Sequence, residues 1–220
     1  PTPSSPSAPN ATALAITATP GTDTVPMRVE GADLVVTLNG LEERHELAKV
    51  QRIEAFLGDG NDVFTADPNV FVNTYVFGDL GDDFLTTGSG NDTISGGAGK
   101  NRLFGGAGND RINGSNGRDS LDGGEGEDRL YGKGGNDTLF GGAGVDRLFG
   151  DDDTGPFGDD VLIGGSSNDN VYGYRGNDRP LGGADVEARV VHDDVFFLFF
   201  LGGRADVDRV GVLRRVGTIA

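Results

Sequence analysis

Aspartate recurs at intervals of nine residues along much of this chain, usually at the sixth position of a glycine-rich unit such as GGAGNDRIN at 105–113. Glycines allow a tight turn that directs several backbone carbonyls inward, and the aspartate adds a carboxylate there. Such an oxygen-only set suits Ca²⁺, which takes about 6–8 ligands in flexible geometry, better than Mg²⁺, which requires a strict octahedron. Zinc would require His or Cys, and the repeats contain neither. The pattern therefore predicts calcium sites.

The spacing also predicts how the aspartates are arranged in space. One unit cannot enclose a core, but two units placed back to back make a flattened coil of 18 residues with a turn at each edge. Residues 18 apart then stack about 5 Å from one another, and their carboxylates would repel without cations. One edge is predicted to carry Asp62, Asp83, Asn101, Asp119, Asp137, Asp160 and Asp178. The other edge is predicted to carry Asp92, Asp110, Asp128, Asp146 and Asp169. Adjacent pairs predict about eight Ca²⁺ ions, with fewer around Asn101, where one charge is missing.

The remaining positions of the repeat indicate which elements hold these turns. In the eleven units from residue 78 onward, position 4 is glycine in ten, and position 8 is Leu, Ile or Val in ten. We expect the first six residues of each unit to form the turn and positions 7–9 to form a short strand, with position 8 facing inward. Stacked coils then give an all-β fold: a parallel β-roll, or β-helix solenoid, with two parallel sheets around an aliphatic ladder.

Units such as GGAGNDRIN, GGEGEDRLY and GGAGVDRLF fit the pattern G-G-x-G-x-D-x-U-x, in which U is a large aliphatic residue. In this respect the chain resembles the RTX, or haemolysin-type calcium-binding, repeat family. The resemblance implies a parallel β-roll with Ca²⁺ in its turns. It also implies a secreted protein, extracellular or at the cell surface, of a kind commonly exported by type I secretion. The departures from the pattern are Asn101, Pro156, Ser167 and Pro180, and we expect the regular array to fail at Pro180.

Composition divides the chain into four parts. They are a disordered linker or tail rich in Pro, Ser and Thr (1–26), strands that lead into the array and cap its first coil (27–56), the RTX-like calcium-binding β-roll (57–181) and a C-terminal cap or secretion tail (182–220). An acidic insertion, GDDDT, interrupts the array at 150–154. The apolar run VFFLFFL at 195–201 is expected to pack as a cap over the last coil.

The net charge of −17 disfavours nucleic acid and anionic lipid as partners. The array alone holds 22 acidic and 9 basic residues, so its calcium-free form is expected to be disordered and calcium binding to drive folding. There is no Cys to form a disulfide. No apolar run approaches the roughly 20 residues of a membrane-spanning helix, so no transmembrane segment is expected.

No motif for catalysis is present. His45 lies in HELAK, which lacks the second histidine of a zinc-protease helix, and the chain has no G-x-S-x-G. We expect an extracellular calcium-binding module, not an enzyme. The alternatives are a calcium-stabilised adhesion or polysaccharide-binding module, or the non-catalytic part of a larger secreted enzyme or toxin.

One pattern points beyond calcium. Arg111, Arg129 and Arg147 are each 18 residues apart, and Tyr131 and Phe149 share their units. An outward row of arginines beside aromatic residues could bind an acidic polysaccharide. The simpler interpretation, which we prefer from the sequence, is that these arginines pair with nearby acids on a solvated face.

Overall fold

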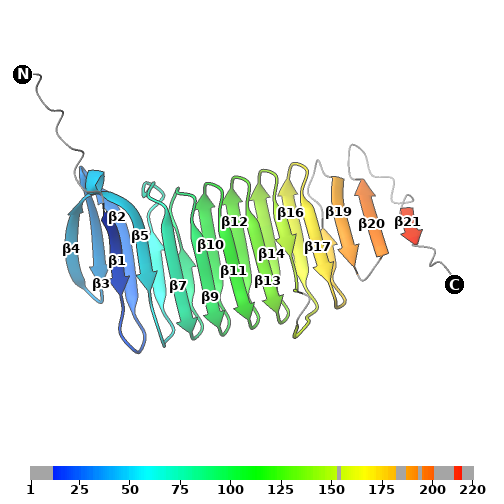
Figure 1. The fold of residues 1–220 in the computed structure, drawn as a ribbon, viewed down its shortest axis with the longest axis horizontal. Coiled ribbons are helices and arrows are strands. Elements are labelled where there is room, and N and C mark those ends of the chain that lie inside the picture. Colours follow the sequence, from blue (N-terminus) through cyan, green and yellow to red (C-terminus); the bar gives the residue numbers. More distant parts are fainter. Residues whose placement is uncertain (1–11, 153–154, 182–186, 193–194, 201–210, 215–220) are drawn as a thin grey trace, which may run out of the picture.

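The computed structural model describes residues 12–152, 155–181, 187–192, 195–200 and 211–214, with side chains described for 13–152 and 155–181. The molecule is an elongated stack of strands that run across its long axis (Figure 1). The chain alternates between two sheets, A and B, so that each full coil adds one parallel strand to each sheet. The predicted all-β parallel β-roll is confirmed.

Sheet A contains, in spatial order, β1 (Thr12–Thr17), β5 (Val50–Phe56), β7 (Thr74–Leu80), β9 (Thr93–Ala98), β11 (Arg111–Asn116), β13 (Arg129–Gly134), β15 (Arg147–Phe149), β17 (Asn170–Tyr174), β19 (Glu187–His192), β20 (Val195–Phe200) and β21 (Gly211–Arg214). Sheet B contains β18 (Arg179–Leu181), β16 (Val161–Ser166), β14 (Thr138–Ala143), β12 (Ser120–Glu125), β10 (Arg102–Ala107), β8 (Phe84–Thr86), β6 (Val63–Ala66), β2 (Thr24–Glu30), β3 (Asp33–Leu38) and β4 (Leu41–Glu46). A single 3-10 turn, Leu47–Lys49, leads from β4 into β5.

The core is a column of aliphatic side chains between the sheets, one from each repeat. In sheet A, for example, Ile112 is in register with Leu130 of the next coil. The position-8 side chains are at most 1% exposed in Leu85, Ile94, Leu103, Ile112, Leu121, Leu130, Leu139, Leu148, Leu162 and Val171. The inward direction predicted for position 8 is therefore confirmed.

The strands are longer than the sequence predicted, and the turns are shorter. Strand β10 begins at position 7 of one unit and continues through position 3 of the next. Only positions 4–6 are left for the turn, so the expectation of a six-residue turn is wrong. The reason lies at position 1, where Gly105 faces inward as part of the strand. A Cβ atom at Gly105 would collide with the carboxylate of Asp110 and the carbonyl of Gly123.

The roll begins earlier than predicted. Residues Thr12–Thr17 form β1, which pairs in parallel with β5, and β2 starts at Thr24 and pairs in parallel with β6. The interpretation of residues 1–26 as a disordered tail is therefore wrong from Thr12 onward. The alternation in TALAIT places Ile16 in the core, 6% exposed, and that burial stabilises a strand despite the surrounding Pro and Ser residues.

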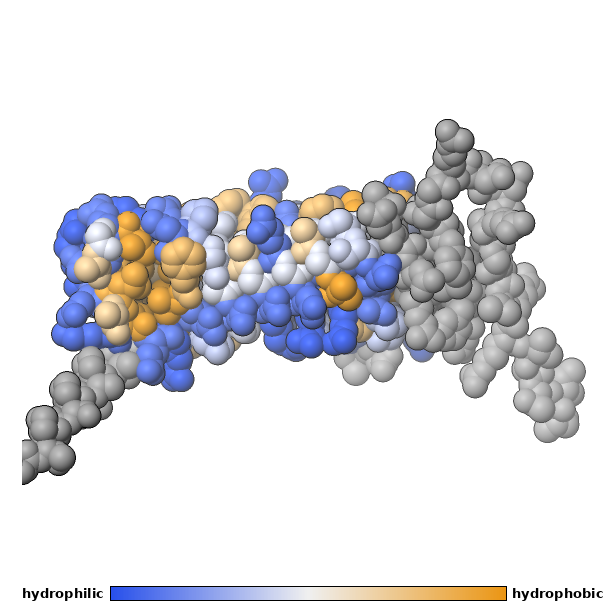
Figure 2. All heavy atoms as spheres, turned by 90° about the horizontal axis from the view of Figure 1, so that it is seen from above, coloured by the Kyte–Doolittle hydropathy of each residue, from blue (hydrophilic) through white to orange (hydrophobic). Residues whose placement is uncertain are grey.

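Beyond the first coil, sheet B continues for two more strands, the antiparallel hairpin of β3 and β4. A cavity of about 250 Å³ opens between this hairpin and β1, with Leu14, Ile16, Val36, Leu38 and Leu41 among its lining residues. Figure 2 shows apolar side chains gathered at this N-terminal end and mostly hydrophilic ones along the rest of the view.

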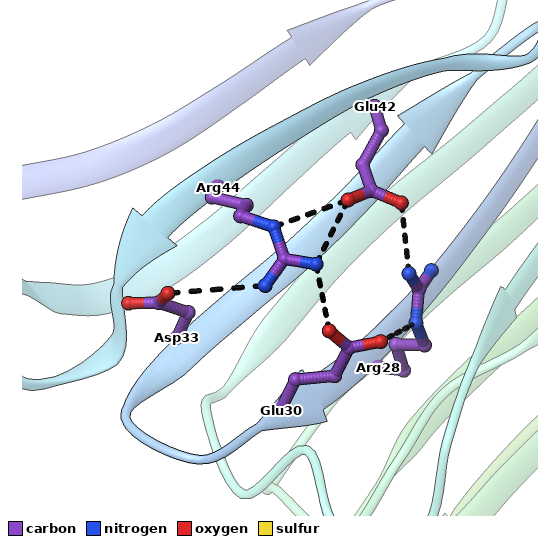
Figure 3. A network of polar contacts seen from close by, with 5 residues as sticks. All are labelled: Arg28, Glu30, Asp33, Glu42 and Arg44. Carbon is purple, nitrogen blue, oxygen red and sulfur yellow. Dashed lines mark hydrogen bonds and ion pairs between the residues drawn. The ribbon is translucent and has the colours of Figure 1, made fainter.

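The outer face of the hairpin carries a network of ion pairs (Figure 3). Arg28 pairs with Glu30 at 2.6 Å and with Glu42 at 2.8 Å, and Arg44 bridges the same two glutamates at 2.7 and 3.0 Å. Each pair is exposed and contributes little alone, but together they link β2 to β4 without a metal ion.

The insertion lies inside a repeat, not in front of one. In a regular pair of coils, the carbonyl of one position-1 glycine faces the position-1 glycine of the coil before it, as Gly123 faces Gly105. The carbonyl of Gly150 faces Gly132 in the same way, so Gly150 occupies position 1. Gly158 occupies position 4, and its N–H donates to the carboxylate of Asp151 at 3.2 Å. The prediction that GDDDT at 150–154 separates two units is therefore wrong. The five extra residues widen the turn between Asp151 and Gly158.

The two sheets end differently. Within the described residues, sheet B ends at β18, where Pro180 is in register with Leu162. Proline is tolerated at such an edge because it has no N–H to donate to a further strand. Sheet A continues through β19, after which β20 and β21 add in antiparallel fashion. Most of the VFFLFFL run thus forms the strand β20 that extends sheet A; its side chains lie outside the described part.

Candidate metal centres

The position-6 residues form two continuous ladders, one at each edge of the roll. In each step the backbone N–H of one residue donates to a side-chain oxygen of its counterpart in the next coil, as from Asp92 to Asp110 at 2.7 Å. The first ladder runs through Asp23, Asp62, Asp83, Asn101, Asp119, Asp137, Asp160 and Asp178. The second runs through Thr74, Asp92, Asp110, Asp128, Asp146 and Asp169. The structure therefore brings together, at the predicted edges, all eleven aspartates that the sequence singled out.

Each of these carboxylates uses only one oxygen in the ladder. Oδ1 accepts the N–H, whereas Oδ2 is buried and accepts no hydrogen bond from the described residues in Asp62, Asp83, Asp92, Asp110, Asp119, Asp128, Asp137, Asp146, Asp160 and Asp169. A buried, unpartnered carboxylate oxygen is costly. A repeated series of them fits the binding of cations in the turns.

The surroundings of Oδ2 add a second acceptor. A Cβ atom placed on Gly123 would meet both Asp128 Oδ2 and the carbonyl oxygen of Gly141. The distance from that Cβ position to the Gly141 oxygen is 2.5 Å. The same pair of oxygens faces the position-1 glycine in other units, including Gly78, Gly105 and Gly132. Two acceptors facing one space, with no donor between them, favour a cation there. A side chain at position 1 would fill that space, which explains the glycine.

In two turns a side chain donates to a backbone carbonyl. Asn101 keeps the ladder bond through Oδ1, and its Nδ2 donates to the carbonyl of Gly97 at 3.1 Å. Thr87 replaces the position-1 glycine of the Asp92 unit, and its hydroxyl donates to the carbonyl of Gly105 at 2.7 Å. Asn101 thus replaces a carboxylate, whereas Thr87 satisfies only the carbonyl and leaves Asp92 Oδ2 without a hydrogen bond from the described residues.

The first ladder starts at a residue that the sequence analysis missed. Asp23 is fully buried, and its carboxylate accepts hydrogen bonds from the N–H and hydroxyl of Thr19 and from Asn39. It therefore begins the ladder without needing a cation. No repeat surrounds Asp23, so only its fit against Asp62 in the folded chain identifies it.

A further acidic residue and an outer ladder were also missed. Asp151 is 2% exposed and lies in the widened turn near Asp160. At position 5, Asn73, Asn91 and Asn109 accept backbone N–H groups from the next coil at 2.9–3.0 Å. The frequent Asn before Asp in the repeat was the available signal for this outer ladder.

Burial also changes how these carboxylates titrate. Desolvation raises the pKa of Asp110, Asp137, Asp146 and Asp160 to about 7, against the ladder N–H bond, which lowers it. The same cause raises the pKa to about 6 in Asp83, Asp92, Asp119 and Asp128. In several of them a neighbouring carboxylate raises the pKa further. A divalent cation would reverse this, because it favours the ionised form.

The donor set fits Ca²⁺ by its chemistry. Where side chains are described, no group of three or more His, Cys, Asp or Glu side chains gathers as one metal site. Each centre would instead combine carboxylates from neighbouring coils with backbone carbonyls, which is a hard, oxygen-only set. The residues that would hold the ions are the eleven ladder aspartates from Asp62 to Asp178, with Asn101 as the neutral exception.

Comparison with known families agrees with this geometry. The model of the RTX calcium-binding nonapeptide repeat (4 copies) matches residues 77–112, 95–130, 104–139, 122–155 and 157–185. The chain belongs to the RTX repeat family. Its RTX array is a calcium-binding module. No curated protein matches the chain. In the described part of this RTX protein, no helix is long and apolar enough to cross a membrane.

Proposed function

We propose that this RTX protein is a secreted module whose folding is driven by Ca²⁺ bound between its stacked turns. The observation that carries the proposal is the series of buried Oδ2 atoms that accept no hydrogen bond. A fold that buries so many carboxylates is unfavourable until cations compensate them, so the binding free energy becomes folding free energy.

The number of ions follows from the ladders. There are ten adjacent pairs among the predicted residues, and two of them include Asn101, which leaves about eight centres with two carboxylates each. The first pair at the N-terminal end, between Asp23 and Asp62, is not counted because the carboxylate of Asp23 has protein partners.

The proposed place of action is extracellular. Sites of about 10⁻⁴–10⁻³ M are typical of extracellular calcium modules. Such sites would be empty in a low-calcium cytosol, where the chain would remain unfolded and suitable for export, for example by type I secretion. Millimolar calcium outside the cell would then fold it. The proposed role is structural and non-catalytic.

Far-UV circular dichroism of the purified chain tests the proposal. The spectrum is recorded in EGTA and then during titration with CaCl₂ or, separately, with MgCl₂. A cooperative change from coil to β-structure with calcium alone is the expected result. A chain that is already β-structured in EGTA and unchanged by calcium would refute calcium-driven folding.

A second role is favoured by the row of Arg111, Arg129 and Arg147 on sheet A. In this role the sheet, once folded by calcium, would bind an acidic polysaccharide on a cell or in its matrix. A third, that the module is the non-catalytic part of a larger enzyme or toxin, has no specific support among the described residues.

A further inference from the structure

Three arginines form a row on the outer face of sheet A, and this arginine row lacks acidic partners. Arg111 is in register with Arg129, and Arg129 with Arg147, and all three are exposed. Among the described residues, the side chains of Arg129 and Arg147 form no ion pair or hydrogen bond, and the guanidinium of Arg111 donates to the hydroxyl of Tyr131. The preferred sequence interpretation, in which these arginines pair with nearby acids, is therefore wrong.

The N-terminal hairpin provides a contrast. There Arg28 and Arg44 each pair with a glutamate at 2.6–2.7 Å (Figure 3), and Arg52 of the neighbouring β5 pairs with Glu54 at 2.7 Å. Like charges directly opposite one another on neighbouring strands destabilise a sheet. An unpaired row of three, in a chain of net charge −17, is thus a feature that an anion from outside would stabilise.

The three strands that carry the row, β11, β13 and β15, contain no acidic residue. The outward residues of β11 and β13, beside the arginines, are Asn113, Ser115, Tyr131 and Lys133, so a fourth cation joins the row. Asp151 follows beyond β15 but is 2% exposed. Asp152 beside it is half-buried, and Glu127 is exposed in the turn before β13. Sheet B has no such row, because its two position-7 arginines are separated by uncharged residues. In spatial order these position-7 residues are Phe84, Arg102, Ser120, Thr138, Val161 and Arg179.

The aromatic residues support the row instead of forming a flat platform. The rings of Tyr131, Phe149 and Tyr172 stack on one another with centroids 4.9 and 5.0 Å apart and planes within 8°. Both faces of Phe149 are therefore covered, as is the face that Tyr131 and Tyr172 each turn toward it. The Arg111 guanidinium closes the stack, 4.4 Å from the ring centroid of Tyr131, and donates to its hydroxyl at 3.1 Å. Recognition must rely on charge and hydrogen bonding, not on stacking of sugar rings.

We propose that the arginine row, with Lys133, binds a linear polysaccharide of uronic acids. Such a polymer carries one carboxylate per sugar, and a sugar ring is close in length to the strand spacing of about 4.8 Å that separates successive arginines. The planar guanidinium forks match carboxylates in bidentate geometry. The proposal rests on the proposed function, because calcium-driven folding creates the row.

Nucleic acid is the less suitable occupant. Its dense phosphate charge would lie between two edges lined with carboxylates, in an array that holds 22 acidic and 9 basic residues. A uronate chain carries less charge per unit length than nucleic acid does.

The test measures binding of an oligogalacturonate, short enough to remain soluble in calcium, to the full chain in saturating CaCl₂ at low salt by calorimetry. Circular dichroism of each sample first establishes that the chain is folded. If it is not folded in calcium, the proposed function fails; if it is folded and does not bind, only the present proposal fails.

The variants make the test specific. Arg129→Gln is expected to weaken binding about tenfold, as loss of a charge-assisted hydrogen bond does, and the triple Arg111→Gln/Arg129→Gln/Arg147→Gln variant to abolish it. The matched control Arg102→Gln removes an exposed position-7 arginine from sheet B and should bind like the wild type, within twofold. The fully methyl-esterified oligomer should not bind. Equal loss in the control, undiminished binding of the ester, or tighter binding of a DNA oligonucleotide would overturn the proposal.

Discussion

Asp128 accepts a hydrogen bond of 2.8 Å from the backbone N–H of Asp110 through Oδ1, while its Oδ2 is buried beside the carbonyl of Gly141 and accepts none. One carboxylate thus performs two separate tasks. One oxygen sets the register of the coils, and the other is left for a cation.

Substitutions at Asp128 separate these tasks. Asp128→Asn keeps an acceptor for the ladder and adds an amide donor, as Asn101 does, so the fold should persist in calcium while the number of bound Ca²⁺ ions falls by about two. Asp128→Ala also removes the acceptor and should lower the free energy of unfolding by a further 1–3 kcal/mol or so. Calcium stoichiometry by calorimetry and chemical denaturation in saturating calcium measure the two effects. Unchanged stoichiometry in both variants would argue against a ligand role for Asp128.

The reverse change at Asn101 should create sites. Asn101→Asp restores the missing charge between Asp83 and Asp119 and removes the Nδ2 donor to Gly97. We expect up to about two more bound ions and a higher calcium concentration at the folding midpoint. Asn109→Asp adds the same charge at an exposed position-5 residue outside the inner ladders and is the matched control. Equal gains in the two variants would mean that charge alone, not ladder position, controls binding.

Calcium and protons should compete for the ladder carboxylates. Their pKa values in the folded chain, about 6 to 7, lie above the ordinary 3.8, so the folded chain binds more protons than the unfolded chain between these values. The ladder carboxylates therefore stabilise the calcium-free fold most below about pH 4, and this contribution is lost as the pH rises through 6–7.

Two measurements test this dependence of stability on pH. In calcium-stripped buffer, β-structure by circular dichroism should be greater at pH 5 than at pH 7.5. In calcium titrations, the midpoint concentration should rise as the pH falls from 8 to 6, because protons must leave before the ion binds. A midpoint that does not vary with pH would exclude these carboxylates as the principal ligands.

Position 2 of the repeat offers a stabilising substitution. Ser115 has a φ of 80° there, a conformation that glycine adopts at the equivalent Gly106, with φ of 98°. Ser115→Gly should therefore raise the free energy of unfolding in calcium by about 1 kcal/mol. Guanidinium denaturation measures the change, and Ser120→Gly, within a regular strand, should instead destabilise. Glycine keeps the backbone N–H that donates to Asn113 Oδ1, so a loss of stability at Ser115 would show that relief of backbone strain does not dominate.

The repeat carried most of what could be predicted. Fixed spacing between Gly, Asp and an aliphatic residue was sufficient for the roll, the inward position 8 and both ladder edges, because each column has one physical reason. Strand β1 was missed because TALAIT belongs to no repeat. Its place depends on pairing with β5, in which the partner of Thr12 is Val50 and that of Thr17 is Phe56. The widened turn was misplaced because Gly150 and Gly155 are equivalent in sequence, and only packing against Gly132 distinguishes them.

The hairpin of β3 and β4 determines how long this molecule can become. The unpaired backbone groups of an edge strand can form hydrogen bonds with a strand of another copy, and repeated pairing of this kind gives filaments. Here sheet B reaches two strands further than sheet A, so a second roll cannot abut the first with both sheets aligned. The outermost strand, β4, is also the charged sequence LEERHE, exposed along almost its whole length. Both features oppose the end-to-end addition of a second copy at this end of the stack.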